Sequence, residues 1–449
     1  MKLWEKGIKV EKFIEEFTIG KDNELDIQLA EYDVLGTIAH TRMLQSIGIL
    51  TELELKKLEY ELIKIYRKIK QGKFQIEEGV EDIHSQIEIM LTDSLGDIGK
   101  KVHTGRSRND QVLVDIKLFT RDKIREITES VYALSSLLLQ QSNKYKDVLL
   151  PGYTHSQIAM PSSFGLWFGA YAESLSDDLI LLQAAYKIAN QNPLGSAAGY
   201  GSSFPLDRTL TTNLLGFDTL NYNVVNAQMG RGKVEKIVTF ALGSIASTLL
   251  KLSMDVCLYS SRNFGFITLP DKYTTGSSIM PHKKNPDVFE IIRAKCNKLQ
   301  GISNMISHMI VNLPSGYHRD MQITKEIFVP AFSELKSCLQ MAELMLTHME
   351  VSKNILQDDK YKYIFSVEDV NKQVLEGIPF RDAYKNTAME IMQEKYEHEG
   401  RDISHTHEGS IGNLCNDEIK KKIKDSMEGF RFDKLDNAYK NLLQDLSLL

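Results

Sequence analysis

The segment TTGSSIMPHKKNPD, residues 274–287, concentrates side chains that can move protons and bind anions. Ser277 offers a hydroxyl beside a flexible glycine, and Lys283 and Asn285 can bind carboxylate oxygens. The glycine and the two prolines argue against a regular helix or strand, so we expect a loop. The alternative interpretation is a flexible linker with solvated lysines.

A histidine lies in a second such segment, PGYTHSQ, in which Thr154 and His155 follow a Pro-Gly pair that predicts a turn. A histidine can serve as an acid or a base near neutral pH, although a lone histidine in a loop is more often a surface residue. Glu290 comes four residues after Pro286, which is placed to open a helix. Its carboxylate could orient the histidine, and the sequence leaves this contact open.

A third segment, KVHTGRSRNDQ, carries two arginines directly before a predicted helix. Arg106 and Arg108 can fork onto carboxylates, while Ser107 and Asn109 add neutral donors. The free N–H groups of a helix N-terminus also attract anions, which favours an anion site. The alternative is a helix cap formed by Asn109 or Asp110, with both arginines in solvent.

Other chemistries lack their sequence patterns. No HExxH motif occurs, and the pair His405 and His407 is weak evidence for a metal site. No GxGxxG follows a predicted strand, and no GxxxxGK[ST] occurs, so we predict neither a metal nor an organic cofactor. The four cysteines form no CxxC pair and are expected to be reduced thiols: Cys257, Cys296, Cys338 and Cys415.

Composition limits the partners and the location. The net charge of -6 gives no basic surface for nucleic acid or an anionic membrane, although a small anionic substrate can still bind a local cationic pocket. The first residues, MKLWEKGIKVEKF, interleave charged and apolar side chains, unlike a secretory signal. No uncharged apolar run of about 18 residues occurs. We therefore expect a cytoplasmic protein.

Long helices must position the three polar segments. Between Gly105 and Pro151 there is neither glycine nor proline, and apolar residues recur there as on one helix face, which predicts a helix roughly 60 Å long. Similar stretches follow Pro161, Lys233, Pro286 and Lys325, and strand signals are nearly absent. We predict an all-α subunit in three parts: an N-terminal helical domain (1–104), a central long-helix bundle (105–350) and a C-terminal helical domain (351–449).

These segments resemble a known superfamily. GSSIMPHKKNP is similar to the GSSxMPxKxNP signature of the fumarase/aspartase superfamily, and HTGRSRNDQ and PGYTHSQ resemble its argininosuccinate lyase branch. The resemblance covers essentially the whole chain, with further matches at EDIH (81–84), LPSGYHRDMQITKE (313–326) and GIPFRDAY (377–384).

The resemblance implies a homotetramer with a twenty-helix core, in which each active site draws loops from three subunits. The implied reaction is reversible elimination of L-argininosuccinate to L-arginine and fumarate, without a metal or organic cofactor. Ser277 would be the catalytic serine, His155 its acid–base partner and Glu290 the carboxylate that raises the basicity of the histidine. Either Ser277 or His155 could abstract the proton, and we favour Ser277. The implied substrate-binding residues are Ser107, Arg108, Asn109, Thr154, Lys283, Asn285, Tyr317, Gln322 and Lys325.

The chain departs from the branch at the periphery of the site. LWEKGIKV replaces the WGGRF of the branch, and the small serine that follows it aligns near Asp22. Arg231 stands in MGRGK, with glycine where aspartate is usual. These changes leave open which residues contact the arginine end of the substrate. They also leave open whether that end is a modified arginine. Two rival interpretations are an adenylosuccinate-type lyase, against which HTGRSRNDQ argues, and a catalytically silent relative like the lens delta-crystallins.

Overall fold

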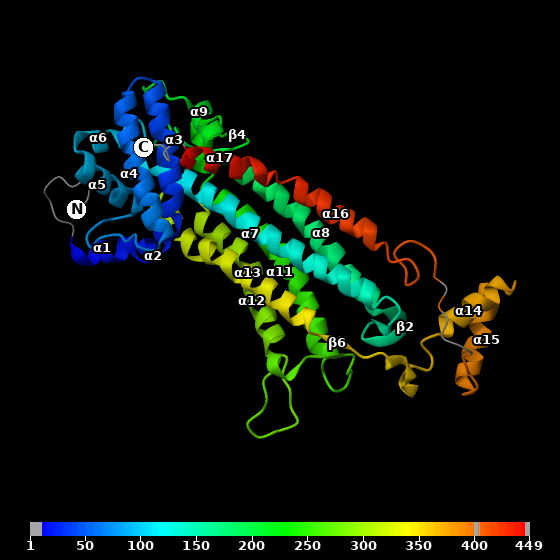
Figure 1. Cartoon of the computed structure of the whole chain (residues 1–449). Helices are drawn as coiled ribbons and strands as arrows, with labels where there is room; N and C mark the ends of the chain where they lie inside the picture. Colours follow the sequence, from blue (N-terminus) through cyan, green and yellow to red (C-terminus); the bar gives the residue numbers. More distant parts are fainter. Residues whose placement is uncertain (1–10, 399–402, 404, 445–449) are drawn as a thin grey trace.

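The computed structural model describes residues 11–398, 403 and 405–444, and nearly all of its regular structure is helical (Figure 1). The prediction of an all-α fold is confirmed. In this described part of the chain, five helices exceed 20 residues and run side by side as a bundle: α7 (Arg108–Lys144), α8 (Phe164–Ala189), α11 (Lys233–Tyr259), α12 (Asp287–Ile310) and α13 (Thr324–Thr347).

The longest helix, α7, has 37 residues and is about 55 Å long at 1.5 Å per residue. It begins with a capping box, in which the side chain of Ser107 and that of Asp110 cap each other's backbone N–H groups. Buried Ile116, Ile124 and Leu138 follow at helical spacing and face the neighbouring helices. The helix ends earlier than the predicted span because the chain turns into a strand after Lys144.

A β-hairpin joins α7 to α8, which the sequence reading did not predict. Strand β1 (Leu149–Thr154) pairs antiparallel with β2 (Gln157–Ser163), and His155 and Ser156 form the two-residue turn with φ of 51° and 60°. The predicted Pro-Gly turn is wrong, because Gly152 lies within β1. A Cβ at Gly152 would lie 2.8 Å from the carbonyl oxygen of Met160, so the glycine permits close approach of the two strands.

The N-terminal helices pack on the starting end of α7 (Figure 1). Phe119 of α7 makes edge contacts with Tyr32 at 5.9 Å and with Phe332 of α13 at 5.7 Å, which ties this cap to the bundle in one apolar core. The helices of this part are α1 (Lys12–Ile19), α2 (Asp22–Asp26), α3 (Ala30–Ser46), α4 (Glu52–Lys70), α5 (Ile83–Leu95) and α6 (Asp97–Lys100).

The C-terminal part divides in space. Helices α14 (Ser366–Leu375) and α15 (Phe380–Met392) form a pair that stands beyond the hairpin end of the bundle (Figure 1). Helix α16 (Asn416–Glu428) then packs along α8, and α17 (Phe432–Gln444) reaches back to the N-terminal helices. The predicted division of the chain at residues 104 and 350 stays a prediction.

Short elements complete the connections. Helices α9 (Arg208–Leu214) and α10 (Val224–Met229) lie between α8 and α11, and two small ladders pair β3 (Gln191–Asn192) with β4 (Thr219–Leu220) and β5 (Ile267–Thr268) with β6 (Glu350–Val351). Pro286 directly precedes α12 rather than being its first residue, and α13 contains Pro330. By length and composition α11 alone, of the described residues, could cross a membrane, and 56% of its most apolar window is buried in the protein, as in the core helix of a bundle.

Candidate active site

A pocket of about 190 Å³ lies where α2, α5 and the start of α7 meet the segment before α13. It brings together five of the predicted substrate-binding residues, Arg108, Asn109, Tyr317, Gln322 and Lys325. The other lining residues are mostly charged: Asp22, Asp26, Glu81, Asp82, His84, Arg231 and Arg319, with Ile19 and Val112. A small, strongly charged pocket of this kind suits a polar, multiply charged ligand.

The EDIH motif holds Arg108 in place. The Nη1 atom of Arg108 lies 2.9 Å from Glu81 Oε2 and 3.0 Å from Asp82 Oδ2, and Nη2 donates to Ser85 Oγ at 2.5 Å. Three partners on two sides fix the plane of the guanidinium at the pocket wall. Arg108 is therefore a rigid, partly exposed cation, with its role in binding a substrate carboxylate still a prediction.

The structure bears on the helix-cap interpretation of the arginine segment, whereas the anion-site interpretation stays a prediction. The helix cap is Ser107, not Asn109 or Asp110: the hydroxyl of Ser107 accepts from the N–H of Asn109 at 3.2 Å. Arg106 is buried, not solvated, and donates from Nη1 to Thr37 Oγ1 at 2.9 Å. Sequence alone could not distinguish these arginines, because burial depends on how α3 packs on α7.

Asp110 fixes a second loop to the start of α7. Its carboxylate accepts from the N–H of Ser107 at 2.8 Å and from the N–H groups of Gly195 and Ala197 at 2.9 and 3.0 Å. Burial raises the pKa of Asp110 to about 6, although these N–H groups and Arg106 favour the charged form. The carboxylate thus holds the glycine-rich segment around Gly195 against the start of α7.

Lys325 of α13 is buried at the far wall of the pocket. Its Nζ atom contacts Asp22 Oδ1 and lies 2.6 Å from Asp26 Oδ1, both on α2. Beside it, the side chain of Gln322 donates to the backbone oxygen of Thr18 at 3.0 Å. A buried ammonium needs such charged partners, and here they also fix the helix that carries them.

The glycine of MGRGK has a conformational reason. Gly232 adopts φ of 77° just before α11, and a Cβ there would lie 2.6 Å from Ile310 Cγ2. Its N–H donates to Glu235 Oε2 at 2.7 Å, and the other oxygen of Glu235 lies 2.9 Å from Nε of buried Arg231. The usual aspartate would be strained in this backbone, next to Arg231, which lines the pocket. The other departure, LWEKGIKV, lies outside the described residues.

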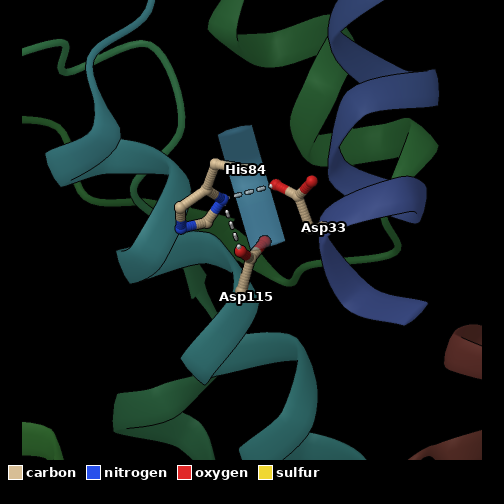
Figure 2. Close-up of side chains that lie close together, drawn as sticks. All are labelled: Asp33, His84 and Asp115. Atoms are coloured by element: carbon tan, nitrogen blue, oxygen red, sulfur yellow. Dashed lines mark hydrogen bonds and ion pairs between the residues drawn. The ribbon is translucent and has the colours of Figure 1, made fainter. Parts of the chain in front are cut away.

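Figure 2 shows a buried cluster behind the pocket, formed by Asp33 of α3, His84 of α5 and Asp115 of α7. The Nδ1 atom of His84 lies 2.9 Å from Asp33 Oδ1 and 3.6 Å from Asp115 Oδ2. The three ligand-type atoms lie within 4.8 Å of one another, close enough to suit a small cation. We assign a proton on Nδ1 of His84, rather than a cation, to this cluster, because Nδ1 lies at hydrogen-bond distance, 2.9 Å, from Asp33 Oδ1.

The protonation of this cluster follows from its surroundings. Burial by itself lowers the pKa of His84, but attraction to Asp33 and the hydrogen bond to that carboxylate outweigh burial and raise the pKa to about 9. Burial and the neighbouring Asp33 raise the pKa of Asp115 well above its usual range. Neither oxygen of Asp115 has a hydrogen-bond partner among the described residues. His84 is therefore an imidazolium at pH 7, and it supports the pocket wall next to Asp82.

The serine segment is an extended loop that leads into α12 (Figure 1). Its base is closed by pairing of Thr275 with Asn285, whose N–H donates to the oxygen of Thr275 at 2.9 Å. Near the tip, the hydroxyl of Ser277 accepts from the N–H of Met280 at 3.2 Å, and Lys283 is exposed. The two ends of the loop are joined, and Lys283 is exposed as the linker alternative expects, so the role of the loop stays a prediction.

The predicted catalytic residues occupy separate places in one chain. His155 and Thr154 are exposed at the hairpin tip beyond the end of α7, whereas Ser277 is on the loop before α12 (Figure 1). Glu290 is exposed in the first turn of α12. None of these four residues lines the pocket that contains Arg108. The roles of these residues stay predictions.

Several further residues of the site also carry a signal in the sequence. Asp26 is four residues after Asp22, so both lie on one helix face, and Asp33 and Asp115 are carboxylates at otherwise apolar helical positions. The i, i+4 spacing of charged residues could have identified the first pair. The second pair and Arg319 become neighbours of the site only through packing.

Comparison with known proteins identifies relatives of the chain. A family model described as lyase matches residues 5–301. The chain is 62% identical to the argininosuccinate lyase of Bacteroides fragilis over 442 residues, which cover 98% of this chain and 99% of that protein.

Two solved structures share the fold. A variant of EDDS lyase with bound fumarate has a TM-score of 0.74 at 22% identity, covering 98% of this chain and 95% of that one. The class II fumarase of Schistosoma mansoni has a TM-score of 0.72 at 15% identity, covering 96% of both chains. Together, the family match, the high identity over nearly the full length and the shared helical bundle show that this chain belongs to the argininosuccinate lyase family.

Proposed function

We propose that the chain catalyses the reversible elimination of L-argininosuccinate to L-arginine and fumarate. The observation that carries this proposal is the 62% identity to an argininosuccinate lyase over nearly the full chain, together with the charged pocket that collects Arg108, Asn109, Tyr317, Gln322 and Lys325. A substrate with three carboxylates, an α-ammonium and a guanidinium requires many fixed charges, and this pocket provides them.

The proposed reaction needs two proton transfers. A base removes a proton from the carbon next to a carboxylate, and the resulting carbanion places extra charge on the carboxylate oxygens. The bond from the neighbouring carbon to the guanidinium nitrogen then breaks, and an acid protonates the leaving nitrogen. Fixed cations such as Arg108 and Lys283 would favour the carbanion over the ground state.

We assign the base to Ser277 and the acid–base partner to His155, with Glu290 as the orienting carboxylate. The joined base of the serine loop supports a hinged movement of Ser277, since Asn285 closes it while the tip stays partly exposed. His155 is exposed at the hairpin tip, so its ring is open to a substrate held by other subunits.

The separation of these residues supports an active site shared between subunits. Arg108 and His155 are at opposite ends of a 37-residue helix, so one small substrate cannot contact both in one chain. Antiparallel packing of α7 with copies of itself would bring the start of one helix beside the end of another. A homotetramer in which three subunits contribute to each site meets this requirement.

Exposed apolar side chains support the same assembly. They lie along the outer faces of the long helices and would be covered by like helices of other copies: Tyr132, Ile180, Phe240, Met254, Ile291 and Met305. Helix α11 is long and apolar enough to cross a membrane, yet only 56% of its most apolar window is buried in one chain. We place the assembled enzyme in the cytoplasm, in arginine biosynthesis.

The proposal is tested by absorbance of fumarate after adding argininosuccinate to the purified chain, and in parallel adenylosuccinate. We expect fumarate from argininosuccinate only. Fumarate from adenylosuccinate instead would select the adenylosuccinate-type alternative, and fumarate from neither substrate would select the silent, crystallin-like alternative.

A further inference from the structure

The far wall of the pocket contains one carboxylate more than its ion pairs require. Asp22 and Asp26 are one turn apart on α2, so both side chains reach the same Nζ atom of Lys325. Behind them, Arg231 pairs with Glu235 at 2.9 Å. In the described part of the chain, three carboxylates thus face two cations at this wall.

The excess charge lies on the residue that faces the open pocket. The side chain of Asp22 is 16% exposed, whereas those of Asp26 and Lys325 are 5% and 4% exposed. Asp22 also lines the pocket beside Tyr317 and Gln322. Burial, followed by repulsion from Asp26, raises the pKa of Asp22, so its charged form needs a further positive partner.

The ion pairs elsewhere in the pocket are matched more evenly. Glu81 and Asp82 face Arg108 at 2.9 and 3.0 Å, and Arg319 lies 3.6 Å from Glu81. A positively charged group on the ligand would therefore be stabilised most by electrostatic attraction if it lay next to Asp22. A serine at this position, as the resemblance implies for the branch, would leave Lys325 and Asp26 as a neutral pair and would offer only a hydroxyl.

We propose that Asp22 determines specificity: it makes this wall select substrates whose amino-acid end carries a free α-ammonium group and reject those acylated on that nitrogen. The inference rests on the proposed function. It states whether the arginine end of the substrate has a free or an acylated α-nitrogen. An ammonium both balances Asp22 and donates hydrogen bonds to it, whereas an amide nitrogen brings no charge and leaves the carboxylate desolvated without a partner.

Kinetics of the full-length enzyme on two substrates test the inference. Argininosuccinate and Nα-acetyl-argininosuccinate are compared by fumarate release with the wild type, Asp22→Asn and Asp22→Ser. We expect a wild-type preference for the free amine of about 100-fold or more in kcat/KM, because a site built for a polar group rejects analogues that lack it. In both variants the preference should fall below about tenfold, through a higher KM for argininosuccinate with kcat changed less than about threefold.

Two controls separate specificity from folding. Asp22→Glu retains the charge and should retain most of the preference. Asp97→Asn removes an exposed carboxylate on α6 and should leave kcat/KM for both substrates unchanged. Calorimetric binding of L-arginine and Nα-acetyl-L-arginine repeats the comparison without turnover. In that assay the wild type should prefer L-arginine, and Asp22→Asn should not.

The outcomes distinguish the inference from the function. If wild type releases fumarate from argininosuccinate but Asp22→Asn keeps the full preference in both assays, the inference is wrong and the proposed function stands. A wild-type preference for the acetylated substrate also overturns the inference. If wild type releases no fumarate from either substrate, the proposed function fails, and a binding preference lost in Asp22→Asn would still support the role of Asp22 in ammonium recognition.

Discussion

Arg108 and His155 belong to one helix–hairpin unit, yet the length of α7 holds them about 55 Å of helix apart. Arg108 opens α7 inside the charged pocket, and His155 is at the hairpin tip beyond the other end. Because α7 is uninterrupted and packed on α8 and α13, no bending within one chain can close this separation. If both residues act on one substrate, they must come from different copies.

Subunit mixing tests this requirement. His155→Asn and Ser277→Ala should each be inactive alone, and they should recover part of the activity when mixed and reassembled. In a mixed tetramer some sites would take the hairpin and the serine loop from unmutated segments. Mixing His155→Asn with Thr154→Val should give no recovery, since both changes are in the same hairpin. Absence of recovery in the first mixture, with subunit exchange shown by mass spectrometry, would refute a shared site.

The assembly itself is a second prediction. Light scattering of the purified chain at micromolar concentration should give a homotetramer, about four times the 51.1 kDa of one chain. Replacing Phe240, which is 60% exposed on α11, by aspartate should dissociate the tetramer, because the charge would be buried between copies. Lys64→Asp on the outer face of α4 is the control and should leave the tetramer intact. A monomer in the wild type contradicts the prediction.

Removal of the serine hydroxyl tests the assignment of the base. Ser277→Ala should lower kcat by about three orders of magnitude, as expected for loss of a principal acid–base group, with little change in substrate affinity. The neighbouring Ser278→Ala is the matched control and should keep most of the activity. Fumarate release measured at saturating substrate gives kcat directly. A Ser277→Ala enzyme with more than about a tenth of wild-type kcat would show that the loop is only a hinge.

Lys283 should behave differently from Ser277. Its exposed ammonium would bind a carboxylate in both the ground state and the transition state, so Lys283→Ala should raise KM as well as lower kcat. The neighbouring Lys284 provides the control, because it pairs with Asp271 and has no proposed part in substrate binding. Lys284→Ala should change KM and kcat less than Lys283→Ala does. Equal effects of the two lysine substitutions would argue against a specific role for Lys283.

The buried histidine predicts a pH dependence of stability. His84 has a folded-state pKa of about 9 against 6.5 when unfolded, so its stabilisation is complete below about pH 6.5 and is lost as the pH rises through 9. The loss is on the order of 3 kcal/mol. Denaturant unfolding of wild type and His84→Gln at pH 6.5 and 9.5 measures it. The difference in unfolding free energy between wild type and variant should shrink at the higher pH.

The control for this prediction is His308→Gln, an exposed change near the end of α12 that should give the same difference at both pH values. The raised pKa of Asp115 acts in the same direction, since the folded state binds its proton more tightly than the unfolded state does. A His84→Gln difference that stays constant from pH 6.5 to 9.5 would contradict a protonated His84.

Local sequence signals predicted the long helices, and the family resemblance named the residues that line the pocket. The run without glycine or proline predicted α7, because a helix continues where nothing interrupts its hydrogen bonds and one face is apolar. The motif residues Arg108, Asn109, Tyr317, Gln322 and Lys325 line one pocket, and their roles in substrate binding stay predictions. The turn was predicted at Gly152, but the chain turns at His155. Gly152 instead lets β1 approach β2 closely, and the sequence around Gly152 does not show which strand pairs with it.

The tertiary structure decided which charges face one another. Arg106 and Arg108 are two residues apart and alike in sequence, yet packing of α3 buries one and the EDIH motif holds the other at the pocket. The excess carboxylate at Asp22 arises because packing brings α2 against Lys325, which is about 300 residues later in the chain. Sequence fixes local hydrogen bonding and apolar periodicity, but electrostatic energies depend on distances and burial, and only the packed chain sets those.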